Sequence, residues 1–185
     1  KNETYWNKLY TATQQKIKSG DTSWKIILNY SYQNQKQTSG SALTYSPEDY
    51  IIAHVEQAGA GTTSPLYSDS VSMHYMGRLI PSTTYTSGLI FDKSWSNDTF
   101  NATTSRPNHS YIGLSYDSKG KPISLVDGFT TALMSMHRGD HWTVYIPHQL
   151  GYGTSASGTV PAYSTLIFDL RLVDFSHPGT KLKDS

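Results

Sequence analysis

Hydrophobic and polar residues alternate along several short segments of the chain, which predicts a strand-rich fold. The clearest case is residues 24–33, where every second side chain is apolar. The apolar positions of this segment are Trp24, Ile26, Leu28, Tyr30 and Tyr32. A period of two is typical of a strand that buries one face. Further segments that predict strands are residues 49–59, 69–80, 88–95, 110–116, 140–147 and 164–175.

Two other segments show helical spacing instead. Residues 3–18 carry one apolar stripe, and Gly20 follows it as a glycine commonly follows a last helical turn. Residues 123–136 place Val126, Phe129 and Leu133 on a second stripe, which predicts a helix before the last two strands. Such a helix must bury its stripe against one face of an antiparallel sheet, which predicts an α+β fold.

A polar segment divides the chain into a short extension and a main domain. Residues 33–41 contain only polar residues and glycine, and they are the best candidate boundary. We therefore expect an N-terminal extension over residues 1–44, a main domain over 45–175 and a polar tail over 176–185. The strand of the extension needs partners for its backbone groups, so we expect it to pack on the main domain.

Composition excludes several classes of protein. The chain has 15 basic and 14 acidic side chains and no run of five like charges, which argues against a nucleic-acid partner. No apolar run approaches the roughly 18 residues of a membrane span. The absence of cysteine removes disulfides, thiolate nucleophiles and cysteine zinc sites.

Two ligand-binding motifs are incomplete. The glycine-rich residues 149–161 resemble a phosphate-binding loop, but Thr159 stands in place of the lysine and a strand pattern follows instead of a helix. His137 and His141 are four residues apart, but Gly139 lies between them at a predicted junction and the glutamate of a zinc motif is missing. We expect neither a nucleotide site nor a metal site.

Five motifs in the second part of the chain carry a family resemblance. They are VSMHYMGRL, IFDKS, LVDGFTTALMSMHRGDHWTVYIP, LGYG and VPAYSTLIFDLRLVDF. In this order and spacing the chain resembles the FKBP-type peptidyl-prolyl cis-trans isomerases over roughly residues 45–175. The resemblance implies an α+β, FKBP-like fold in which a twisted antiparallel sheet wraps around one short helix. It also implies catalysis without a metal or cofactor.

The resemblance implies four catalytic residues. Tyr75 would offer its hydroxyl at the pocket wall, and Asp92 would be the carboxylate of the pocket. Tyr152 would be the hydrogen-bonding tyrosine of the loop that overhangs the pocket, and Phe168 the aromatic side chain at its back.

The resemblance also implies five substrate-binding residues. Phe91 would form an apolar wall, and Val160 would be the aliphatic residue of the overhanging loop. Leu125 and Val126 would line the base and supply a backbone donor. Phe129 occupies the floor position, where the family often has tryptophan.

Two functions of different classes follow from these residues. The first is an isomerase that accelerates rotation of X-Pro bonds and assists the folding of envelope or secreted proteins. The second is a weakly active or inactive peptide-binding or chaperone module that uses the same pocket, which the phenylalanine at position 129 favours. A third hypothesis is carbohydrate binding by exposed aromatic side chains.

The resemblance implies that proline-containing polypeptides are the partners of the chain, and that the macrolide inhibitors of the family are further ligands. It implies no particular oligomeric state. The chain begins at Lys1, lacks cysteine and is rich in hydroxyl side chains. These features favour a bacterial cell envelope, with the protein in the periplasm and with either a secretion signal or a lipid anchor in a removed N-terminal segment.

Overall fold

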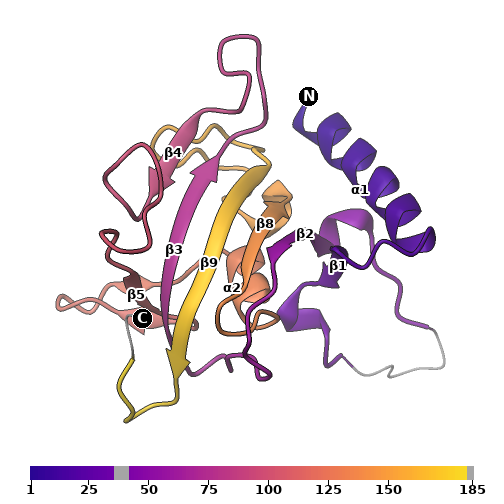
Figure 1. The fold of residues 1–185 in the computed structure, drawn as a ribbon. Coiled ribbons are helices and arrows are strands. Elements are labelled where there is room, and N and C mark those ends of the chain that lie inside the picture. The colour runs from indigo at the N-terminus through magenta and orange to yellow at the C-terminus, as the bar shows by residue number, and fades with distance from the viewer. Residues whose placement is uncertain (36–41, 183–185) are drawn as a thin grey trace.

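The computed structural model describes residues 1–35 and 42–182. The predicted polar loop 33–41 lies largely outside the described residues, as do the last three residues of the predicted tail. Within the described ranges the fold combines one large antiparallel sheet with two α-helices that lie apart from each other (Figure 1).

The large sheet contains seven strands of the described chain. They are β1 Trp24–Leu28, β2 Tyr50–Gln57, β3 Ser70–Arg78, β4 Ile90–Lys93, β5 Asn108–Tyr111, β8 His141–Ile146 and β9 Leu166–Ser176. Their order across the sheet is β1-β2-β8-β9-β3-β4, and β5 also pairs with β3. The two long central strands β3 and β9 pair along their whole length, as Figure 1 shows.

The predicted strand 110–116 is wrong as a single strand. It divides into β5 and β6 Ser115–Tyr116, and β6 forms a small hairpin with β7 Pro122–Ile123. The strand is interrupted between Tyr111 and Ser115, where Gly113 lies against the Tyr67 ring, and a Cβ at Gly113 would lie 2.6 Å from that ring. The hairpin of β6 and β7 is a two-stranded sheet separate from the large one.

Helix α2, Asp127–Leu133, packs on one face of the sheet and supplies the centre of the core. Every residue from Gly128 to Leu133 is buried. Gly128 permits the close approach, since a Cβ there would lie 2.5 Å from the Ile146 side chain of β8. The helix ends before the predicted stripe does, but Met136 still packs in the core.

The N-terminal extension joins the same sheet at its edge. Strand β1 pairs antiparallel with β2, with Trp24 opposite His54. Helix α1, Asn2–Lys18, lies on the outer side of this edge (Figure 1). Its buried Trp6 donates a hydrogen bond from Nε1 to the carbonyl of Pro47 (3.2 Å), next to the short 3-10 helix η2 Pro47–Asp49.

The prediction of one strand over residues 24–33 is wrong beyond Leu28. The chain turns there into the 3-10 helix η1 Tyr30–Tyr32. Asn29 is 1% exposed, and its Oδ1 accepts a hydrogen bond from the Thr131 hydroxyl of α2 (3.1 Å). The backbone N–H of Tyr30 donates to the same hydroxyl oxygen (3.0 Å). These contacts with α2 override the local alternation and tie the extension to the helix.

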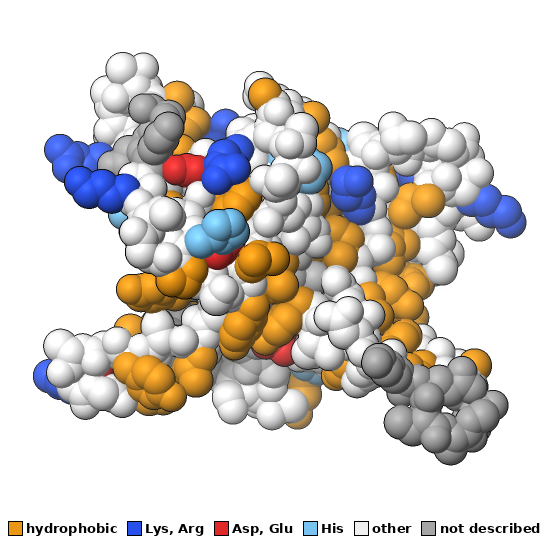
Figure 2. Space-filling view, turned by 90° about the horizontal axis from the view of Figure 1, so that it is seen from below, with side chains coloured by type: hydrophobic (Ala, Val, Ile, Leu, Met, Phe, Trp, Pro, Cys, Tyr) orange, Lys and Arg blue, Asp and Glu red, His pale blue; other side chains and the backbone are white. Residues whose placement is uncertain are grey.

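The surface is poor in charge and rich in apolar and uncharged polar side chains. Seen from below, several separate hydrophobic patches lie on this face, and the lysines and arginines are scattered rather than gathered in one patch (Figure 2). The exposed large apolar side chains of the fold include Leu66, Tyr67, Tyr111, Leu114, Tyr116 and Ile123.

Replacing Asn29 should weaken the contact between the extension and α2. We expect Asn29→Ala to lower the free energy of unfolding by about 0.5–1.5 kcal/mol, because the hydrogen bonds of the Asn29 amide with Thr131 and Asp127 are lost while the Thr131 hydroxyl keeps the Asp127 carbonyl as an acceptor. The matched control is Asn7→Ala on the exposed side of α1, which should change stability by less than about 0.5 kcal/mol. Urea denaturation of both variants makes the measurement, and equal losses would contradict the tether.

Candidate functional site

A cavity of about 140 Å³ lies between α2, β3 and β9, beneath the loop that follows β8. Its lining residues are Met73, Tyr75, Asp92, Asn108, Ser124, Leu125, Val126, Phe129, Tyr152 and Phe168. All four predicted catalytic residues and three of the five predicted substrate-binding residues are among them. Residues that lie far apart in the sequence therefore meet in one cavity.

Three aromatic rings form the inner surface of this cavity. Tyr75 comes from β3, Phe129 from α2 and Phe168 from β9. The centroids of Phe129 and Phe168 are 5.0 Å apart with the rings at 87°, and those of Tyr75 and Phe129 are 5.8 Å apart at 88°. Edge-to-face packing of this kind holds the rings in fixed orientations. The result is a rigid apolar wall.

Phe91 and Val160 lie outside the lining. The Phe91 ring packs edge-on against Phe168 at 5.6 Å, behind the aromatic wall. Gly77 makes room for both rings, because a Cβ there would lie 2.5 Å from Phe91 and 2.7 Å from Phe168. Val160 is 3% exposed and belongs to the core. The structure thus places both residues in support of the cavity rather than on its surface.

The rim of the cavity is polar. The Tyr75 hydroxyl donates a hydrogen bond to Asp92 Oδ2 (3.1 Å). Burial and the nearby Asp92 charge together raise the pKa of Tyr75 from 10.0 to about 12. Burial also raises the pKa of Tyr152, and the negative charge of Asp92 raises it further. Both phenols are therefore protonated at neutral pH and can donate hydrogen bonds.

Three lining residues escaped the sequence reasoning. Met73 could have been found, because it lies two positions before Tyr75 on the same face of β3. Ser124 could have been found as the neighbour of Leu125. Asn108 gave no signal, since it reaches the cavity only through the pairing of β5 with β3, where it lies opposite Met73.

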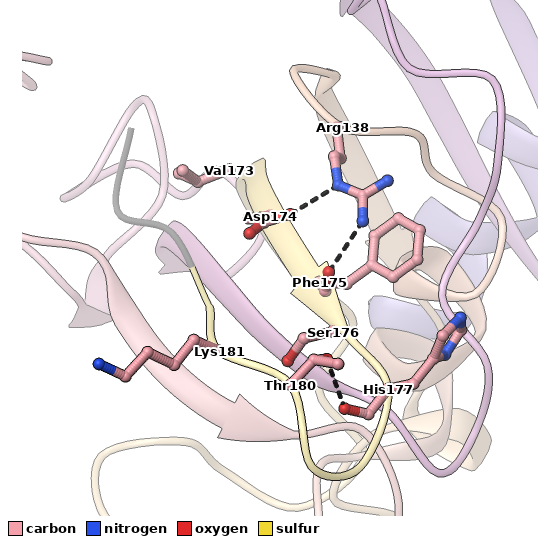
Figure 3. A pocket seen from close by; sticks show the side chains of 8 residues that line it. All are labelled: Arg138, Val173, Asp174, Phe175, Ser176, His177, Thr180 and Lys181. Carbon is pink, nitrogen blue, oxygen red and sulfur yellow. Dashed lines mark hydrogen bonds and ion pairs between the residues drawn. The ribbon is translucent and has the colours of Figure 1, made fainter.

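Another cavity, of about 360 Å³, lies at the end of β9 and contains none of the predicted site residues (Figure 3). Arg138 donates to Asp174 (2.6 Å) and to the carbonyl of Phe175 (2.9 Å), and its guanidinium covers the Phe175 ring at 3.8 Å. These contacts fasten the α2–β8 connection to the end of β9. The arginine therefore has a structural role here.

No group of three or more histidine, aspartate or glutamate side chains in the described part of the chain is arranged to hold a metal ion. Within residues 1–35 and 42–182, no helix has the length and apolar character needed to cross a membrane.

Comparison with solved structures identifies the class of fold. A peptidyl-prolyl cis-trans isomerase from Pseudomonas syringae pv. tomato aligns with a TM-score of 0.55 at 20% sequence identity, covering 96% of this chain and 98% of that one. The wheat FKBP73 structure aligns with a TM-score of 0.51 over 69% of this chain and 46% of that chain, at 23% identity. The predicted α+β, FKBP-like fold is confirmed.

Sequence comparison identifies the family. Residues 61–173 match the model of the FKBP-type peptidyl-prolyl cis-trans isomerase family, and the chain belongs to this family. The macrophage infectivity potentiator of Trypanosoma cruzi is 34% identical over 149 residues, which are 80% of this chain and 63% of the relative. The peptidyl-prolyl cis-trans isomerase Mip of Coxiella burnetii is 31% identical over 125 residues, 64% of this chain and 42% of the relative. The chain thus spans less than two thirds of the length of either relative.

The tyrosines at the rim make a prediction for alkaline pH. The pKa of Tyr75 is about 12 in the folded state, above the value of 10.0 that it has in the unfolded chain. The contribution of this residue to the stability of the folded state is therefore fully present below pH 10 and is lost as the pH rises to about 12. Tyr30 and Tyr145 also have pKa values of about 12, so the test needs a difference between variants. In a spectrophotometric titration of phenolate absorbance, Tyr75→Phe should lose one group near pH 12.

Asp92→Asn provides the matching control for this titration. It should move the Tyr75 transition to lower pH, because the repulsive carboxylate charge is removed, while burial keeps the pKa above its ordinary value. A Tyr75→Phe curve that superimposes on the wild-type curve would show that the rim assignment is wrong.

Proposed function

We propose that the chain is a peptidyl-prolyl cis-trans isomerase that binds a proline side chain in the aromatic cavity. One observation carries the proposal: an apolar wall of Tyr75, Phe129 and Phe168 meets a polar rim of Tyr152, Asp92 and the Tyr75 hydroxyl. Membership of the isomerase family supports it. Leu125 and Val126, just before α2, would supply an aliphatic wall and a backbone donor for the peptide.

The chemistry of the X-Pro bond explains why such a cavity would be effective. The planar imide is polar because the nitrogen lone pair is delocalised onto the oxygen, and the twisted transition state loses this delocalisation. An apolar wall therefore disfavours the ground state more than the transition state. The donors on the rim would hold the peptide while the bond rotates. A thousandfold acceleration requires only about 4 kcal/mol of differential stabilisation.

An assay of cis-to-trans conversion in short X-Pro peptides tests the activity. We expect acceleration that saturates with peptide, and a reduction of kcat/KM by about twofold to tenfold in Tyr152→Phe, because one hydrogen bond to the substrate is lost. Tyr85→Phe, in an exposed loop outside the cavity, should leave the rate unchanged. Absence of acceleration at micromolar protein would rule the enzyme out.

The alternative is a peptide-binding or chaperone module with poor turnover, and the Phe129 floor is the observation that favours it. If the smaller ring limits catalysis, Phe129→Trp should raise kcat/KM, whereas Tyr85→Trp, which adds an indole at an exposed position, should not. In this alternative, Asp92→Ala should still bind an unfolded proline-containing client. Fluorescence titration of a labelled client measures that binding, and its loss in Asp92→Ala would contradict the alternative.

The proposal extends to partners, domains and location. Proline-containing polypeptides are the substrates, and the macrolide inhibitors of the family are proposed as competing ligands of the same cavity.

The isomerase domain is proposed to span residues 45–175, with residues 1–44 as an extension and 176–185 as a tail. A location in the bacterial cell envelope rests on the cysteine-free, hydroxyl-rich composition, and fractionation of cells that express the full gene would test it.

A further inference from the structure

A row of polar side chains crosses the face of the sheet opposite α2. In the register of the strands, His74 of β3 lies opposite Arg171 of β9, and Arg171 lies opposite His141 of β8. His141 in turn lies opposite Gln57 of β2. The neighbours of Arg171 along β9, Leu170 and Leu172, are core residues, so the row faces away from the core.

This row lines a cavity of about 360 Å³ that is separate from the aromatic cavity. The connection between β4 and β5 supplies one side of it through Phe100 and Ala102. The guanidinium of Arg171 lies over the Phe100 ring at 4.1 Å, and the His74 ring meets the same phenyl ring edge-on at 4.8 Å. The cavity thus combines a row of hydrogen-bond donors with an aromatic side.

Two buried nitrogens of the row, His74 Nδ1 and Arg171 Nε, make no hydrogen bond in the described part of the chain. His74 is 5% exposed, and its buried Nδ1 has no hydrogen-bond partner among the described residues. That favours the tautomer with the proton on Nε2, at the other edge of the ring. Asp169 accepts from His141 Nε2 (2.8 Å), and its second oxygen forms an ion pair with Arg171 Nε at 3.4 Å that has no hydrogen-bond geometry.

The other carboxylate at this cavity is already occupied. Asp140 accepts hydrogen bonds from the backbone N–H groups of Gly59 (2.7 Å) and His137 (2.9 Å), one on each oxygen. It therefore holds two loops together and does not compete for the row. Asp169 contacts two members of the row, His141 and Arg171.

We propose that this cavity binds an oxyanion, and specifically the phosphate group of a phosphate monoester. Arginine and histidine donors give the strong, charge-assisted hydrogen bonds that such anions accept. His74 and His141 lie on the two strands that flank Arg171, each about 4.8 Å away, so the side chains of the row are spread across three strands. The oxygens of a tetrahedral phosphate point in more directions than the two oxygens of a planar carboxylate and can reach more of these side chains. Phe100 would contact an apolar substituent of the ester.

A change in the pKa of His74 can distinguish a site that binds an anion from a row of side chains that only stabilises the fold. Burial lowers the pKa of His74, and the positive charge of Arg171 lowers it further. The charged or titratable side chains that line the same cavity in the described residues are Asp140, His141 and Arg171. A bound anion would offset the Arg171 charge and raise the pKa of His74, so binding should take up a proton.

An NMR titration of the histidine ring signals tests the proposal and does not depend on isomerase activity. The probes are inorganic phosphate, phenyl phosphate and benzoate, added at constant ionic strength. We expect saturable shifts of His74 and His141 with both phosphates, and a rise in the pKa of His74. Phenyl phosphate should bind roughly threefold to tenfold more tightly than inorganic phosphate because its ring contacts Phe100.

Two arginine variants separate a built site from general surface charge. Arg171→Gln should weaken phenyl phosphate binding at least tenfold, as expected for the loss of a charge-assisted hydrogen bond of about 1.5–3 kcal/mol. Arg78→Gln, on β3 outside the cavity, should bind as the wild type does. Linear shifts without saturation, or equal weakening in both variants, would overturn the site. Benzoate binding as tight as that of phenyl phosphate would overturn the choice of phosphate.

Discussion

The packing of α2 against the sheet is the contact on which the rest of the structure depends. It requires Gly128, because any side chain there would meet Ile146 of β8. The close approach brings Phe129 into edge-to-face contact with Phe168, so one ring belongs both to the core and to the cavity wall. Substitutions in this wall therefore change folding stability and ligand binding together.

The elements that the sequence predicts well are those whose burial is set by local pattern. Buried and less buried side chains alternate along β8 and most of β9, because one face of each strand packs toward α2. The same period of two is visible in the sequence as alternating apolar and polar residues. The end of β1 could not be predicted in this way. Asn29 is fixed by Thr131, 102 positions later in the chain, and no local pattern carries such a contact.

The same distinction applies to the candidate site. Motifs on β3, β4, α2, β9 and the loop after β8 predict its residues, and most of these residues line the cavity. Phe91 and Val160 belong to the same motifs but do not line the cavity. A residue's place in a motif does not determine how deeply its side chain is buried behind the cavity wall. Asn108 enters the cavity through strand pairing alone. Predicting it requires the topology, which no single segment of the sequence contains.

Alternation along a strand gives the sheet two faces of different chemistry. On β3, Tyr75 faces the aromatic cavity while its neighbour His74 faces the polar row. On β9, Leu170 and Leu172 pack in the core while Arg171 between them faces the other side. Because one backbone carries both faces, a shift of β3 against β9 would move the aromatic wall and the polar row together. The extensive pairing of these two strands opposes such a shift and so keeps both cavities in shape.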